Sequence, residues 1–131
     1  MLADAAEVTA NQKLYLLGGG WNQLWTKAFP TNHPMAIAIG VLVPWPLTDE
    51  THVITVEIRD QDGNPIAPTV NAELKVGRPV NLKQGSTQRL MFVVQGFFGI
   101  PRAGAYAVRA AVGEVTRSAS FDADVGALPG R

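Results

Sequence analysis

The segment 51–59 alternates polar and apolar side chains. Ile54, Val56 and Ile58 fall on one face of an extended chain, and mostly polar residues occupy the positions between them. Alternation with a period of two is typical of a strand with one buried face. An Asp-Gly pair follows at positions 62–63, and glycine readily adopts the positive φ that a tight turn needs. The chain is therefore predicted to be built from β-strands joined by hairpins.

Other alternating or β-branched runs are punctuated by glycine and proline, and no stretch has a convincing helical period. Seven or eight short strands at regular spacing predict an all-β fold, a single antiparallel β-sandwich of the immunoglobulin-like kind. One domain is expected over residues 1–131, with an extended N-terminal segment at 1–12, a loop at 21–34 and a C-terminal tail at 122–131. The expected strands cover residues 2–8, 14–17, 35–43, 53–59, 70–76, 88–94, 106–112 and 115–121.

One local pattern supports this fold class. The segment 100–106 resembles the stretch that leads into the penultimate strand of immunoglobulin-like and fibronectin-like modules. In those modules a tyrosine near the start of the strand caps the corner with its hydroxyl group. The resemblance implies this role for Tyr106.

The charge content is low for a soluble domain. Charged residues make up 17% of the 131 residues, and 11 basic residues balance 11 acidic ones, whereas about 25% is typical. Without a basic excess, binding to a nucleic-acid backbone is not expected. Low charge also does little to keep separate molecules apart, which favours a protein that works in an assembly.

Nothing in the sequence predicts export or membrane insertion. There are no cysteines, which suits folding in a reducing compartment. The N-terminal stretch carries Asp4 and Glu7 and lacks the basic start of a signal peptide. The longest apolar run, 35–45, is too short for a membrane-spanning helix, which needs about 20 residues. We expect cytoplasmic synthesis without a signal peptide and no membrane partner.

The usual signatures of catalysis and metal binding are missing. The glycines at 18–20 lack the lysine and hydroxyl residue of a phosphate loop, and the acidic turn at 60–64 lacks EF-hand spacing. His33 and His52 are the only histidines, and neither has a carboxylate at ligand spacing. Both are expected to face solvent. We expect no enzyme, catalytic residue, metal or cofactor, although distant carboxylates could still meet in the fold as in a hydrolase.

Three tryptophans form the candidate ligand site. Trp21 and Trp25 lie in the expected loop, and Trp45 lies just beyond the third expected strand. Exposed indole faces can stack on ligands such as sugars. The alternative is that these rings close one end of the core, as large aromatic side chains commonly do.

An excess of apolar residues on expected outer faces is the strongest sign of a protein partner. Met91 and Val93 lie opposite a buried face, and Leu42 lies on the small-residue face of the third expected strand. Phe97 and Phe98 are adjacent, so one of them should point away from the core if this stretch is extended. These five residues are the candidate interface. The alternative is a second buried layer, formed by a loop or the tail folding over the sheet.

The N-terminal third carries four distinctive segments: Ala3-Asp4-Ala5-Ala6, Lys13-Leu14-Tyr15, Gly18-Gly19-Gly20-Trp21 and Pro44-Trp45. With these segments the chain resembles a family of small uncharacterised bacterial and actinobacterial-phage proteins. That family has no assigned activity, so the resemblance implies a fold and no site residues.

Taken together, these features predict a non-enzymatic structural or interaction module that acts in a protein assembly. Its partners would be further copies of itself or a larger assembly, and its most concrete form is a phage virion protein that decorates a capsid or tail. The alternative is a small-ligand or carbohydrate-binding module that uses the tryptophan-rich loop. A defined oligomer would favour the first function, and glycan protection of tryptophan fluorescence would favour the second.

Overall fold

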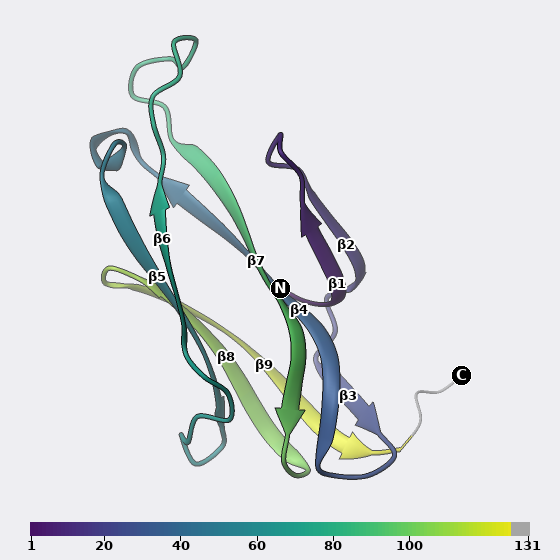
Figure 1. The fold of residues 1–131 in the computed structure, drawn as a ribbon. Helices are drawn as coiled ribbons and strands as arrows, with labels where there is room; N and C mark the ends of the chain where they lie inside the picture. Colours follow the sequence, from purple (N-terminus) through teal and green to yellow (C-terminus); the bar gives the residue numbers. More distant parts are fainter. Residues whose placement is uncertain (127–131) are drawn as a thin grey trace.

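The computed structural model describes residues 1–126, which form nine strands and no α-helix (Figure 1). In chain order the strands are β1 (Leu2–Val8), β2 (Leu14–Gly19), β3 (Gln23–Thr26), β4 (Thr31–Val43), β5 (Thr51–Asp60), β6 (Val70–Lys75), β7 (Gln88–Ile100), β8 (Gly104–Val112) and β9 (Val115–Val125), and a short 3₁₀ helix, η1 (Trp45–Leu47), follows β4.

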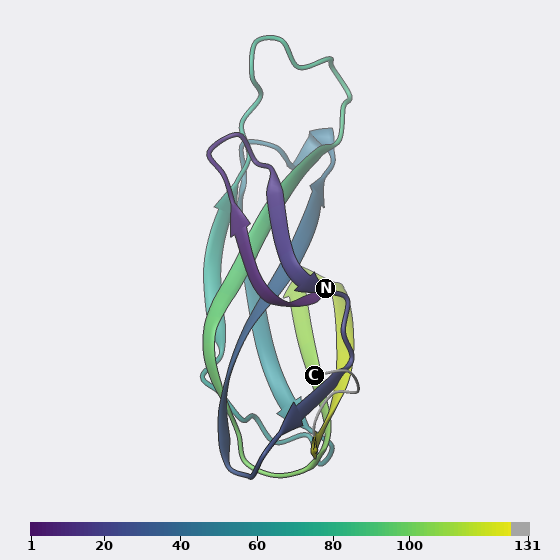
Figure 2. The ribbon, with the colours of Figure 1, turned by 90° about the vertical axis from the view of Figure 1, so that its right-hand side faces the viewer.

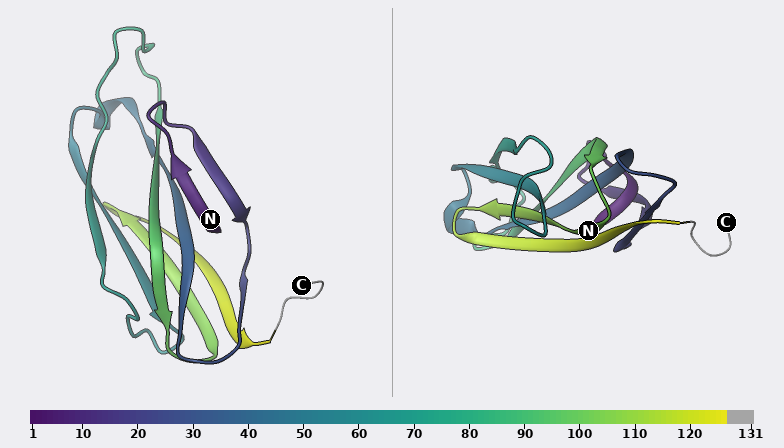
Figure 3. Two further views of the ribbon diagram at one scale, coloured as in Figure 1. Left: turned by 45° about the vertical axis from the view of Figure 1, so that its right-hand side comes forward. Right: turned by 90° about the horizontal axis from the view of Figure 1, so that it is seen from below.

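The strands make two sheets. Sheet A has the order β2-β1-β4-β7, and sheet B has the order β3-β9-β8-β5-β6. All neighbouring strands are antiparallel except β3 and β9, which run parallel. Figure 3 shows the arrangement of the strands in an oblique view and from below. The predicted all-β class is confirmed, but the described residues form nine strands rather than seven or eight.

Three strand predictions needed correction. The expected loop at 21–34 contains β3 and the start of β4, and β7 runs on to Ile100. Strand β9 continues to Val125, so part of the expected tail at 122–131 is strand, while residues 127–131 lie outside the described chain. Local sequence could not reveal β3, because only Leu24 in it is buried and its pairing with β9 joins distant parts of the chain.

The core lies between the sheets. Met35 and Ile100 of sheet A and Ile54 and Phe121 of sheet B are its largest fully buried side chains. The predicted faces of β4 are confirmed, because its larger alternating residues are buried or pack against this core. Burying each such side chain contributes about 1.5–3 kcal/mol to stability, so this shared core holds the two sheets together.

Tyr106 lies near the start of β8 and closes the corner that leads into it, as its sequence context predicted. Its hydroxyl group donates a hydrogen bond to the carbonyl oxygen of Arg102 at 2.6 Å. The ring is buried and stacks on Phe121, with centroids 5.4 Å apart. The tyrosine therefore fixes the entry to β8 against the core of sheet B.

The hairpin of β1 and β2, which belongs to sheet A, folds over the outer side of β4 and β7 (Figure 2). Strand β1 pairs with β4 only at Leu2 and Ala3, and Figure 2 shows the hairpin in front of β4 and β7. The Ala6 N–H donates to Gln95 Oε1 at 2.7 Å, and the Met91 N–H donates to Gln12 Oε1 at 3.1 Å. These contacts fix the hairpin against β7 as a partial third layer.

Candidate interaction surface

The last strand of sheet A, β7, has one unpaired edge. Its 13 residues pair with β4 in one continuous register from Gln88 to Ile100, and no described strand lies on its other side. From Leu90 to Ile100 it carries no charged residue and no proline. Soluble proteins usually protect such edges with charges, proline or a covering segment. This edge is therefore the main candidate for contact with another chain.

The ladder with β4 shows which backbone groups face this edge. The N–H of Ala38, whose partner residue on β7 is Val93, bonds to Met1 on the opposite side of β4. Ala38 and Val93 are therefore a non-hydrogen-bonded pair, and alternate residues of β7 point their N–H and C=O groups outward. The Met91 N–H donates to Gln12 Oε1. Beyond it, the outward groups belong to Val93, Gln95, Phe97 and Gly99, for which the described chain supplies no hydrogen-bond partner.

The candidate interface residues fall into three groups. Phe97 is 72% exposed and Leu42 is 61% exposed, whereas Met91 and Val93 are half-buried. Phe98 is half-buried and packs against the core, so its ring does not lie on the outer face with Phe97. One of the two adjacent phenylalanines does face outward, as alternation required, and it is Phe97.

Part of the expected outer surface is already covered. Ala36 and Ala38 lie on the outer side of β4, yet they are only 0% and 6% exposed. The alternative of a second buried layer is therefore correct for this patch, where β1 and Met1 lie against β4. The open part of the surface is the C-terminal half of β7.

The tryptophans do not form one site. Trp21 makes edge-to-face contacts with His33 and Phe121, at centroid distances of 6.1 and 5.8 Å, and its buried Nε1 has no partner in the described chain. Trp45 lies beyond the other end of the 13-residue β4, roughly 40 Å away at the rise of a β-strand. There it packs beneath the Arg78 guanidinium, 4.1 Å from the ring centroid.

Trp25 lies on β3 in register with Asp124 and is partly exposed. Of the three tryptophans, Trp21 packs against the core. The alternative that these rings close the core is therefore correct for Trp21.

Both histidines are half-buried, contrary to the expectation that they face solvent. Burial lowers the pKa of His33, while the carboxylate of Asp4 opposes this shift. His52 Nε2 lies 2.8 Å from the carbonyl oxygen of Leu47. Each histidine is thus held in a local packing contact.

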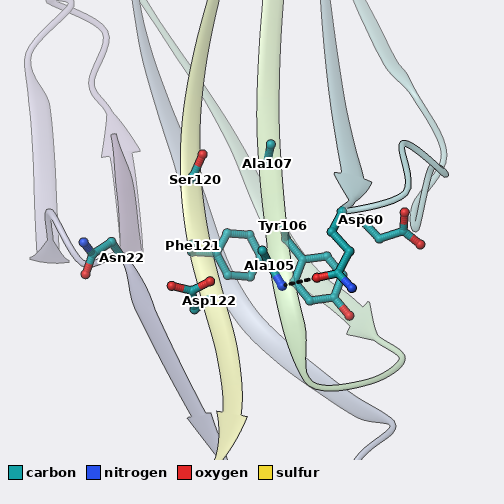
Figure 4. A pocket seen from close by; sticks show the side chains of 9 residues that line it. Asn22, Asp60, Ala105, Tyr106, Ala107, Ser120, Phe121 and Asp122 are labelled. Carbon is teal, nitrogen blue, oxygen red and sulfur yellow. Dashed lines mark hydrogen bonds between the residues drawn. The ribbon is translucent and has the colours of Figure 1, made fainter.

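A shallow polar hollow of about 390 Å³ lies on the outer side of sheet B (Figure 4). Ala105 and Ala107 supply its small side chains, and Ser120 and Asp122 of β9 line it beside them. Asn22 and residues from the end of β5 complete the lining. Amide, hydroxyl and carboxylate groups can hydrogen-bond a polar molecule, and neither histidine lines this hollow.

Asp60, which borders the hollow, is engaged in a structural turn. Its Oδ1 accepts the N–H groups of Asn64 and Asp62 at 2.9 and 3.0 Å, and its Oδ2 accepts from Arg102 Nη2 at 2.9 Å. The N–H of Asn64 has the largest effect in holding the pKa of Asp60 below its ordinary value, against the opposing effect of burial. The carboxylate therefore stays ionised and fixes the turn after β5.

Within residues 1–126, no three His, Cys, Asp or Glu residues come together in a way that could hold a metal ion. The described chain also has no helix long and apolar enough to span a membrane.

The outward backbone of Val93, Gln95 and Gly99 was missed from sequence, because side-chain patterns do not show which backbone groups remain unpaired. The one available signal was the uncharged run from Leu90 to Ile100.

No match was found among curated proteins or solved structures. A family model matches residues 1–121. The chain therefore belongs to the family described as "Family of unknown function (DUF6941)".

Proposed function

We propose that this protein is a non-enzymatic structural module that acts in a protein assembly, most concretely a phage virion protein that decorates a capsid or tail. The observation that carries the proposal is the uncharged, unpaired edge of β7 with Phe97 72% exposed upon it. Such an edge favours pairing with another chain. The low charge content and zero formal net charge support close packing of copies.

The finer fold assignment belongs to the same proposal. We assign the chain to the immunoglobulin-like sandwiches, because β4 pairs with β7 in one sheet and β9-β8-β5 form the centre of the other. The corner made by Tyr106 supports this assignment. Modules of this architecture serve as building blocks in many assemblies, so the fold alone does not select a partner.

The test is the absolute mass of the purified chain in solution, by light scattering over a wide concentration range. A defined oligomer is expected, because the β7 edge offers both unpaired backbone groups and apolar side chains. A monomer at every concentration, and equally in the presence of candidate virion proteins, would contradict the proposal.

The polar hollow supports a second candidate, the binding of a small polar ligand or carbohydrate. Asn22, Ser120 and Asp122 offer groups that hydrogen-bond hydroxyls, and the partly exposed Trp25 lies two residue pairs along the β3–β9 ladder from Asp122. Glycan titration of tryptophan fluorescence tests it, with Trp25→Ala as the variant expected to lose the signal. Unchanged fluorescence across a glycan panel would rule this candidate out for those ligands.

A further inference from the structure

We propose that the partner of the β7 edge is a second copy of this chain, bound by antiparallel β7–β7 pairing around a two-fold axis at Gly96. The inference rests on the proposed function and names the partner for that edge. It joins sheet A of one copy to sheet A of the other, giving one continuous eight-stranded sheet from two sheets of 4 strands.

The positions of the unpaired backbone groups set this register. Val93, Gln95, Phe97 and Gly99 point their N–H and C=O groups outward, and they are spaced symmetrically about Gly96. Two antiparallel copies centred there place Gln95 opposite the partner's Phe97, and Val93 opposite the partner's Gly99. In such pairs both residues exchange N–H···O bonds. All the outward groups of these four residues are then satisfied.

A β7–β7 pairing shifted toward the start of β7 is excluded, because it would need the outward N–H of Met91, the residue two positions before Val93. The N–H of Met91 already donates to Gln12 Oε1. Near the same end, Gln88 Nε2 donates to the carbonyl oxygen of Gly77, in the long connection between β6 and β7. Figure 3 shows this connection at the end of the molecule away from the β7 arrowhead. The open half of β7 is therefore the half that the proposed pairing uses.

Charge favours self-pairing over pairing with a charged strand. The run from Leu90 to Ile100 contains no charged residue, so the two-fold pair sets no like charges against one another. The formal net charge of the whole chain is also zero, which minimises long-range repulsion between copies.

The side chains near the axis allow two backbones to approach. A Cβ atom built at Gly96 or Gly99 would meet nothing within 4 Å, so no other part of residues 1–126 occupies this space. Glycine within a strand often marks the close approach of another backbone. Phe97, which is 72% exposed in the single chain, would be covered beside the partner's Gln95.

The opposite edge of sheet A fits less well. Strand β2 exposes Leu17 by 71%, but it has only 6 residues. Gly18 and Gly20 have φ of +60° and +86°, which interrupts the extended backbone there. A second copy could pair with β2 over a shorter length than with β7.

Single-cysteine cross-linking tests the register directly, because the chain has no cysteine of its own. Gly96→Cys would lie opposite the partner's Gly96→Cys in a non-hydrogen-bonded pair, about 4.5 Å apart between Cα atoms, within the range of a disulfide. Under mild oxidation we expect Gly96→Cys to form a covalent dimer nearly completely. The matched control, Leu17→Cys on the β2 edge, should remain mostly uncross-linked.

A second pair of variants keeps the test decisive if Gly96→Cys fails to fold. Phe97→Lys is expected to weaken dimerisation about tenfold or more, because the two introduced lysines would occupy diagonal positions across the axis, roughly 7–8 Å apart between their Cα atoms, and their like charges would repel. Leu17→Lys, at a residue of nearly the same exposure, should leave the dimer unchanged. Thermal unfolding of the monomers should match wild type for both.

The outcomes separate the two proposals. A defined oligomer that survives Phe97→Lys, or that cross-links through Leu17→Cys instead of Gly96→Cys, would overturn β7 self-pairing and leave the assembly function standing. Wild-type chain that stays monomeric alone but binds a virion protein would also overturn β7 self-pairing and leave the assembly function standing. Wild-type chain that is monomeric at all concentrations and binds no candidate partner would overturn both.

Discussion

The terminal strands β6 and β7 manage their free edges in opposite ways. Strand β6 has 6 residues, and its exposed residues include Glu73 and Lys75. Strand β7 has 13 residues and no charge from Leu90 to Ile100. Short, charged edges resist pairing with another chain, whereas long, uncharged edges invite it. This difference is the basis of our proposal that another chain extends sheet A, whereas sheet B ends at β6.

The largest effect is expected for a core substitution, which tests whether the sheets that carry the two edges unfold as one cooperative unit. Phe121→Ala removes a fully buried ring between the sheets and should lower the free energy of unfolding by about 3–5 kcal/mol. Chemical denaturation should show a single transition by both tryptophan fluorescence and circular dichroism. Two separate transitions would mean that the sheets, and hence their edges, are held independently. Val115→Ala, at a 59% exposed residue of the same strand, is the control.

Removing the charges of β6 should make the two edges alike. The double variant Glu73→Val and Lys75→Val is expected to strengthen self-association beyond the dimer by about tenfold, or about 1.4 kcal/mol, because β6 then lacks its protecting charges. Sedimentation velocity would detect the larger species. The matched control, Glu114→Val with Arg117→Val, removes one charge of each sign away from the edge strands. Unchanged association in the β6 variant would show that charge does not distinguish the edges.

A substitution at Tyr106 tests whether the stability of sheet B affects dimerisation through the β7 edge of sheet A. Tyr106→Phe keeps the ring on Phe121 but removes the hydrogen bond to Arg102. We expect a loss of about 1 kcal/mol in unfolding free energy and no change in dimerisation. Tyr15→Phe, at a 57% exposed residue, should change neither quantity. Weaker dimerisation in Tyr106→Phe would show that the corner of sheet B influences the β7 edge.

The acidic turn at the end of β5 gives sheet B a pH dependence that the β7 edge lacks. The pKa of Asp60 is lowered in the folded chain from its ordinary 3.8. Its stabilising contribution is therefore complete above that value and is lost as the pH falls through the lower, folded-state pKa.

Denaturation curves at a series of acidic pH values should show wild type losing stability in that range, with a flatter profile for Asp60→Asn. Asp122→Asn, at an exposed carboxyl, should follow wild type. Identical profiles for Asp60→Asn and wild type would contradict a structural role for the carboxylate.

The smallest expected effect concerns salt. If uncharged strands join the copies, the dimer dissociation constant should change by less than about twofold between about 0.05 and 0.5 M salt, because no exposed ion pair is screened. Analytical ultracentrifugation at the two salt concentrations measures it. A strong salt dependence would place charged residues in the interface and would contradict the contrast between β6 and β7.

Much of the fold could be predicted because the evidence for it is local. The alternating side chains of β4 and β5 identified their buried faces, and the segment before Tyr106 identified the corner. Such patterns arise from the period of the strand itself. Less of the candidate interaction surface could be predicted from the sequence. Sequence required either Phe97 or Phe98 to face outward, but the choice depended on an unbroken register through Gly96.

The sequence by itself therefore determined the all-β class, the main strands and the uncharged character of β7. Tertiary structure alone decided that β3 pairs with β9, that the first hairpin covers Ala36 and Ala38, and that β4 separates Trp21 from Trp45. It also decided which backbone groups of β7 remain unpaired. The physical reason is that side-chain periodicity is encoded between near neighbours, whereas hydrogen bonding between strands depends on which distant segments meet.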